Sequence, residues 1–122
     1  MNFTVLGALV GALSVVLGAF GAHALRGQLE PAMQAVYETA VRYQFLHAIA
    51  LLFVGRLGPG APRPGSGLAG ALFTCGIVLF SGSLYALVFT RLTWWGAVTP
   101  LGGLAFIAGW LALASAFWGR TR

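Results

Sequence analysis

The sequence predicts an all-α membrane protein in which four transmembrane helices form a compact bundle. Of the 122 residues, 59% are hydrophobic and only 7% are charged, whereas about a quarter of the residues in an average soluble domain are charged. The hydrophobic residues form long blocks that short polar stretches separate. A chain of this length has room for four spans of about 20 residues with short connections. We expect residues 1–122 to form a single membrane domain.

The first predicted span covers residues 3–25. One of its faces carries small side chains, and such a stripe lets two helix backbones approach closely. The residues of this stripe are Gly7, Gly11, Ser14, Gly18 and Gly21. The letters AHA at residues 22–24 resemble a signal-peptidase site, but MNFTV at residues 1–5 has no Lys or Arg to begin a signal peptide. We expect the span to remain uncleaved.

The second predicted span covers residues 37–57 and follows a more polar segment, residues 26–37. In that segment Leu29, Met33 and Val36 have helical spacing. Pro31 suits the first position of a helix, which needs no N–H donor. We expect an interfacial helical segment that continues without a break into the span.

The third and fourth predicted spans cover residues 68–90 and 96–118. The connection before them, residues 55–67, holds three prolines and five glycines, so we expect it to face water. The letters RLTWW at residues 91–95 indicate a tight turn with two tryptophans at the membrane interface. The fourth span has a second stripe of small residues, made of Gly102, Ala105, Gly109, Ala112 and Ala116.

The arginines predict the orientation of the chain. Four spans place both termini and residues 55–67 on the same side of the membrane. That side collects Arg56, Arg63, Arg120 and Arg122, and the other side has Arg26 and Arg91. The positive-inside rule then puts both termini in the cytoplasm. Because the arginines lie singly at the edges of apolar blocks and form no basic stripe, we expect no nucleic-acid partner.

Polar side chains gather in the first half of the second span. Glu38 and Arg42 are four residues apart on one helix face, so we expect them to form an ion pair close to the headgroups. Tyr43, Gln44 and His47 fall on a different side, which suits the bundle interior. An ionisable residue inside a membrane is a candidate functional site. His47 is either a neutral imidazole that hydrogen-bonds a neighbouring helix, or a proton or ligand site.

The histidines do not predict a cofactor site. His23 lies near the end of the first span, where we expect it to pair with Glu30 or Glu38. Its depth differs from that of His47 by about 8 Å, which does not suit two axial haem ligands. The one Cys, two His and two Glu also lack the spacing of a zinc site. With no nucleophile and base pair evident, we expect no metal, no cofactor and no enzyme activity.

Other polar residues favour structural roles. Ser81, Ser83 and Thr99 are typical of residues that hydrogen-bond between membrane helices. Cys75 lies inside an apolar run, where a small packing residue is expected. A lone cysteine forms no internal disulfide, so the redox compartment stays open.

Four sequence segments together resemble a known family. They are GAFGAHAL at residues 18–25, TAVRYQFLHAIALL at 39–52, SGSLYAL at 81–87 and TPLGGLAFIAGW at 99–110. In this order they resemble the small bacterial membrane proteins grouped as domain-of-unknown-function family 423, which are related to eukaryotic transmembrane protein 256. The resemblance implies a four-span α-helical protein of the bacterial inner membrane, with no established activity.

The family motifs also single out particular positions. They place His23, Tyr43, Gln44, His47, Ser81, Ser83, Tyr85 and Pro100 in this chain. Family members commonly carry Gln where this chain has Arg42, which implies that an ion pair with Glu38 is a local variation.

Three classes of function remain in view. The leading interpretation is a non-enzymatic packing, scaffold or accessory subunit that assembles with itself or with a larger membrane complex through its glycine stripes. The alternative is a small oligomeric transporter or channel with a polar path near His47. An enzyme or redox subunit comes third. A hydrated cavity that reaches His47 would favour transport, whereas a dry, packed His47 would favour the structural interpretation.

Overall fold

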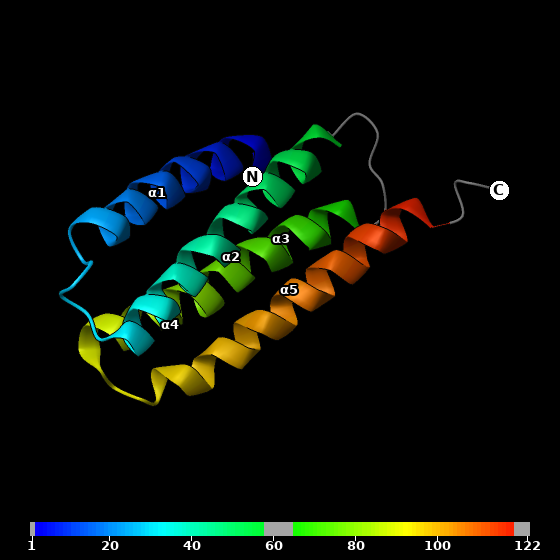
Figure 1. Ribbon diagram of the computed structural model, residues 1–122. Coiled ribbons are helices and arrows are strands. Elements are labelled where there is room, and N and C mark those ends of the chain that lie inside the picture. The colour runs from blue at the N-terminus through cyan, green and yellow to red at the C-terminus, as the bar shows by residue number, and fades with distance from the viewer. Residues whose placement is uncertain (1, 58–64, 119–122) are drawn as a thin grey trace.

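The chain folds into helices only, over the part that the structure describes. This computed structural model describes residues 2–57 and 65–118. Its elements are α1 (Phe3–His23), α2 (Pro31–Arg56), α3 (Ser66–Gly76), a π-helical segment η1 (Ile77–Ser81), α4 (Gly82–Thr90) and α5 (Trp95–Phe117). α3, η1 and α4 follow one another directly and form one continuous rod, called the third rod below. With α1, α2 and α5, the described residues therefore form four helical rods (Figure 1). The predicted all-α class is confirmed.

The starts of the first two helices follow from local chemistry. The side-chain oxygen of Asn2 accepts hydrogen bonds from the backbone N–H groups of Thr4 and Val5, at 3.0 and 3.2 Å, and so caps α1. α2 begins at Pro31, as predicted, and continues without a break to Arg56. Most of the proline-rich connection (residues 58–64) and the sites of Arg63, Arg120 and Arg122 lie outside the described residues.

α1 and α2 approach each other closely along the first stripe of small residues. A Cβ atom added at Gly7 would lie 2.8 Å from the backbone oxygen of Ala48, and one added at Gly21 would overlap the ring of Tyr37. Gly55 of α2 has no room for a side chain either, because Thr4 lies against it. The close approach that the stripe predicts is confirmed, and it lies within the chain.

The second stripe brings α5 against the third rod. Gly102 lies directly on the backbone of Phe80, and a Cβ atom at Gly109 would come within 2.7 Å of the ring of Phe73. The tightest glycine contacts of both stripes are therefore used inside the fold. That the stripes also join separate copies or partners stays a prediction.

The third rod contains an irregularity that the sequence did not predict. The predicted span 68–90 is interrupted at Ile77–Ser81, where the helix widens into a π turn. A π turn accommodates one extra residue and so rotates the helix that follows relative to the helix before it. Phe80, on which Gly102 packs, belongs to this turn.

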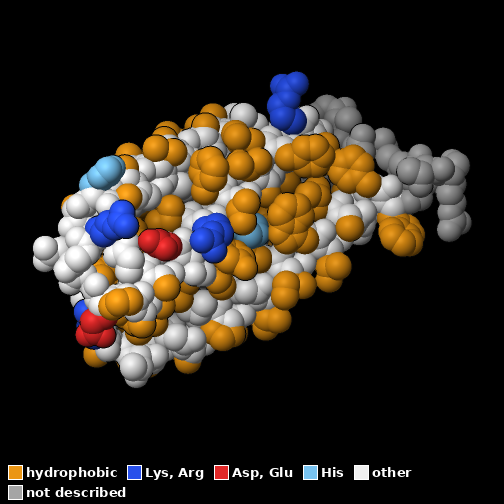
Figure 2. Space-filling model, in the orientation of Figure 1, with side chains coloured by type: hydrophobic (Ala, Val, Ile, Leu, Met, Phe, Trp, Pro, Cys, Tyr) orange, Lys and Arg blue, Asp and Glu red, His pale blue; other side chains and the backbone are white. Residues whose placement is uncertain are grey.

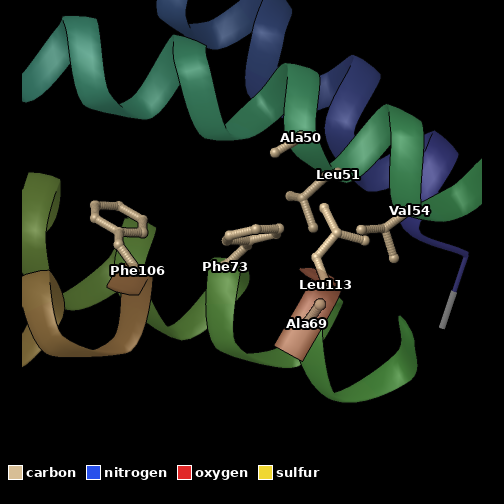
Figure 3. Close-up of a cluster of buried hydrophobic side chains, with 7 residues drawn as sticks. All are labelled: Ala50, Leu51, Val54, Ala69, Phe73, Phe106 and Leu113. Atoms are coloured by element: carbon tan, nitrogen blue, oxygen red, sulfur yellow. The ribbon is translucent and has the colours of Figure 1, made fainter. Parts of the chain in front are cut away.

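The four rods form a row in which α2 holds a central place. α1 packs against α2, α5 packs against α3, η1 and α4, and α2 joins the two groups. In Figure 1 the rods lie in the order α1, α2, α3–α4, α5, and the start of α1 lies toward the same end of the molecule as the end of α5. Figure 3 shows side chains of α2, α3 and α5 pointing toward one another around Phe73. Its residues are Ala50, Leu51, Val54, Ala69, Phe73, Phe106 and Leu113.

Three of the rods are long and apolar enough to cross a membrane. They are Phe3–His23, Ser66–Thr90 and Trp95–Phe117. These rods correspond to the first, third and fourth predicted spans. α2 carries more polar side chains and does not meet the same criterion within the described residues.

Adjacent glycines of α5 give a matched test of this packing. Gly102→Ala should lower the free energy of unfolding in detergent by about 1–3 kcal/mol, because the new methyl group meets the Phe80 backbone. At Gly103 the nearest atom is 4.0 Å from an added Cβ. Gly103→Ala should therefore be neutral or stabilise by up to about 1 kcal/mol. Equal thermal stability of the two variants would contradict the packing described.

Candidate functional site

The candidate site is built on the buried face of α2. Tyr37, Gln44 and His47 are each less than 5% exposed and share this face with Ala40 and Leu51. The predicted inward direction of Gln44 and His47 is confirmed. Tyr43, in contrast, is 38% exposed, although its ring packs at 4.7 Å on that of Phe80.

Gln44 joins three helices through one amide group. Its Oε1 accepts a hydrogen bond from the hydroxyl of Tyr85 on α4 at 2.7 Å. Its Nε2 donates to the backbone oxygen of Val10 on α1 at 3.4 Å. These partners fix the orientation of the amide, because the backbone carbonyl of Val10 can only accept a hydrogen bond and so must face the NH2 group of Gln44. Both ends of the buried amide are therefore satisfied by neighbouring helices.

The hydrogen bonds of His47 define its protonation state. Nδ1 lies 2.7 Å from the backbone oxygen of Tyr43, which can only accept, so Nδ1 carries the proton. Nε2 lies 3.1 Å from the indole Nε1 of Trp110, which can only donate, so Nε2 is unprotonated. The geometry thus describes a neutral imidazole with both nitrogens satisfied. The ring also stacks on Phe106 with centroids 3.6 Å apart.

Hydroxyl groups add further links between the rods. Ser81 Oγ donates to the backbone oxygen of Ala40 on α2 at 2.7 Å. Ser83 Oγ lies 2.5 Å from Thr99 Oγ1 of α5. The interhelical role predicted for these hydroxyls is confirmed.

Two contributors to this network were not predicted from the sequence. The Tyr37 hydroxyl donates to the backbone oxygen of Leu17 on α1 at 2.5 Å. Trp110 supplies the only N–H that reaches His47 Nε2 among the described residues. Tyr37 lies seven residues before Gln44, so the helical repeat itself signalled that both face the same way. No sequence signal connected Trp110 with His47, which lies 63 positions earlier.

The predicted ion pairs are wrong. Glu38 accepts a hydrogen bond from Gln34 Nε2 at 3.4 Å and does not pair with Arg42. His23 is exposed at the end of α1 and pairs with neither glutamate, because Glu30 forms an ion pair with Arg91 at 3.3 Å. The helical spacing of Glu38 and Arg42 permits a contact, but the Glu38 carboxylate is bonded to Gln34 instead.

Cys75 is exposed on the outer side of α3 and does not fill the core, contrary to the prediction. The two histidines lie apart as well, with His23 at the end of α1 and His47 buried in the interior. Among the described residues, no three His, Cys, Asp or Glu side chains come together as a metal site.

A groove of about 660 Å³ opens beside His47, between α2 and α5. Arg42, Tyr43 and Ile49 line it from α2, and Trp110 and Leu113 line it from α5. Figure 2 shows hydrophobic, arginine and histidine surfaces meeting in the middle of the visible face. The groove walls are mainly apolar, so the edge of the hydrogen-bonded site faces an apolar surface.

Comparisons with known proteins place the chain among bacterial membrane proteins. A family described as "Protein of unknown function (DUF423)" matches residues 17–103. A UPF0382 membrane protein of Staphylococcus haemolyticus is 48% identical over 91% of this chain and 90% of its own length. The UPF0382 membrane protein YwdK of Bacillus subtilis is 46% identical over 93% of this chain and 94% of its own length. No solved structure matches the chain.

Two tyrosines test the network with one chemical change. Tyr85→Phe removes the hydroxyl that donates to Gln44 and should lower the free energy of unfolding by about 0.6–1.7 kcal/mol. Tyr43→Phe should change it little, because the Tyr43 hydroxyl has no hydrogen-bond partner among the described residues. Thermal unfolding in detergent measures both. A loss at Tyr43 as large as that at Tyr85 would contradict the assignment.

Proposed function

The chain belongs to the DUF423 family of proteins of unknown function, and we propose that it is a non-enzymatic accessory or scaffold protein of the bacterial inner membrane. The observation that carries this proposal is that the polar groups in the interior of the protein are hydrogen-bonded to one another and to the backbone. The amide of Gln44 and the ring of His47 have all their polar atoms bonded to other helices or to backbone. Catalysis or permeation needs polar groups that are free to meet a substrate or ion. This interior supports rigid packing instead.

We propose that α2 is a fourth membrane span. α1 has 21 residues and a length of about 31 Å, close to the thickness of the hydrocarbon region. Near one end of α1, Thr4 lies against Gly55, and near the other, Leu17 accepts from Tyr37. α2 therefore runs beside α1 over nearly its whole length. The polar side chains of Tyr37, Gln44 and His47 are tolerable at this depth because they bond to other helices.

The ends of the helices support a proposed placement in the bilayer. α2 has 26 residues, about 39 Å, so its first turns, residues 31–36, would project beyond the hydrocarbon as an interfacial segment. We place both termini in the cytoplasm, because that side collects four of the six arginines outside the spans. On the face shown in Figure 2, the acidic side chains lie toward the opposite end of the molecule.

The outer faces support a role in association with lipids or other membrane helices. Several large apolar side chains on the outer faces of α1 and α5 are more than half exposed. Examples are Leu9 and Val16 on α1 and Leu104, Ile107 and Leu111 on α5. We therefore expect the protein to act as a homo-oligomer or within a larger complex. A second candidate, a small transporter, is favoured only by the groove that reaches His47.

Replacing His47 separates the two candidates. His47→Leu should lower the free energy of unfolding in detergent by about 0.6–1.7 kcal/mol, because the bonds to Tyr43 and Trp110 are lost. In liposomes that contain a pH-sensitive dye, wild type and variant should both conduct protons no faster than protein-free liposomes. The control His23→Leu changes an exposed histidine and should leave stability unchanged. Proton flux by the wild type that His47→Leu abolishes at unchanged stability would overturn the scaffold role.

Cysteine labelling tests the four-span placement. Single cysteines at position 28 and position 66, in a chain in which the exposed Cys75 is replaced by Ser, lie in the connection before α2 and at the start of α3. A membrane-impermeant maleimide added to intact cells should label the cysteine at 28 at once and the cysteine at 66 only after permeabilisation. Labelling of both from the same side would rule out α2 as a span.

A further inference from the structure

The groove between α2 and α5 has one charged end and a long apolar remainder. Among the described residues that line it, Arg42 alone is charged. Leu46, Ile49 and Phe53 follow Arg42 on successive turns of α2 and line the same groove. A second hollow of about 330 Å³ shares Phe53 with this groove and extends it toward the end of α5. The surface therefore has the form of an amphiphile, with a cationic head position and an apolar track.

With α2 as the proposed fourth span, Arg42 lies inside the membrane, and no acidic side chain of the described residues forms an ion pair with it. Val41 lies beside Gly18, so Arg42 sits about 8 Å inside the end of α1 at His23. Glu38, one turn earlier, is bonded to Gln34, and Glu30 is bonded to Arg91. An arginine at this depth gains from an anion or from reaching the headgroups. Beside it, the hydroxyl of Tyr43 has no hydrogen-bond partner among the described residues.

We propose that this groove binds one anionic phospholipid, with its phosphate at Arg42 and Tyr43 and one acyl chain along Leu46, Ile49 and Phe53. Arg42 and Phe53 are eleven residues apart on α2, which is about 16 Å along the helix. This length is close to half of a hydrocarbon region of about 30 Å, so it is comparable to the length of one acyl chain. The groove volume of about 660 Å³ also falls in the range of pockets that enclose small ligands.

Charge favours a lipid over a second copy of the chain as the occupant. The whole sequence has two acidic residues, Glu30 and Glu38. Glu30 of a second copy would have to leave its ion pair with Arg91, and Glu38 lies one turn from Arg42 itself. A phospholipid supplies both the missing anion and the apolar chain. The site is independent of the proposed scaffold role, because it leaves the bonds of Gln44 and His47 unaltered.

Native mass spectrometry of the detergent-purified full chain tests the proposal. The protein is titrated with an equal mixture of dioleoyl phosphatidylglycerol and dioleoyl phosphatidylcholine. Wild type should retain one lipid per chain and prefer phosphatidylglycerol about five-fold, which corresponds to about 1 kcal/mol for one arginine near anionic lipid. Arg42→Gln should abolish the preference. Ile49→Trp should reduce retention of both lipids, because the indole fills the groove.

Matched controls separate the groove from general effects. Arg26→Gln removes an exposed arginine outside the groove, and Ile107→Trp enlarges a residue of α5 that is 58% exposed and does not line it. Both should retain lipid as the wild type does, and thermal unfolding confirms that each variant is folded. The proposal is overturned if the wild type shows no preference, or if Arg26→Gln removes it as fully as Arg42→Gln. A two-chain species that Ile49→Trp dissociates would identify a second copy as the occupant and would equally overturn it.

Discussion

A polar side chain within the hydrocarbon region of a membrane has no water to bond with, and α2, which we propose to be a membrane span, carries several polar side chains. This constraint explains how the other rods are arranged around α2. α1 offers the backbone oxygens of Val10 and Leu17, α4 offers the hydroxyl of Tyr85, and α5 offers the indole N–H of Trp110. Each contact satisfies a polar group that, left without a hydrogen bond in lipid, would destabilise the fold by several kcal/mol. These hydrogen bonds therefore hold the other three rods against α2 and also satisfy the polar side chains of α2.

The glycines make these bonds geometrically accessible. The Tyr37 ring lies against Gly21 of α1, where any side chain would block it. With the backbones this close, a tyrosine hydroxyl on α2 reaches a carbonyl of α1 directly. Gly102 has the same role on the other side, where it brings α5 onto the π turn at Phe80. Small residues and polar residues thus act together, since the first allow the approach that the second require.

Local patterns predicted much of this arrangement, and non-local contacts account for the rest. Pro31, the two stripes and the inward direction of Gln44 and His47 follow from helical periodicity and from the chemistry of a helix start. The partner of His47 does not, because Trp110 reaches it only through the packing of α5. The π turn, whose Phe80 contacts Gly102 of α5, has no signal in the local sequence pattern. Glu38 and Arg42 had suitable spacing, yet Gln34 competes for the carboxylate.

The central claim is that the interior polar groups are dry and satisfied by each other, with His47 as the clearest case. Nitrogen-15 magnetic resonance of the protein in lipid bilayers reads the protonation of each ring nitrogen directly. Our account predicts a neutral His47 ring with its proton on Nδ1 and with Nε2 accepting from the Trp110 indole. A ring protonated at Nε2, or an imidazolium that exchanges its protons with water, would contradict it.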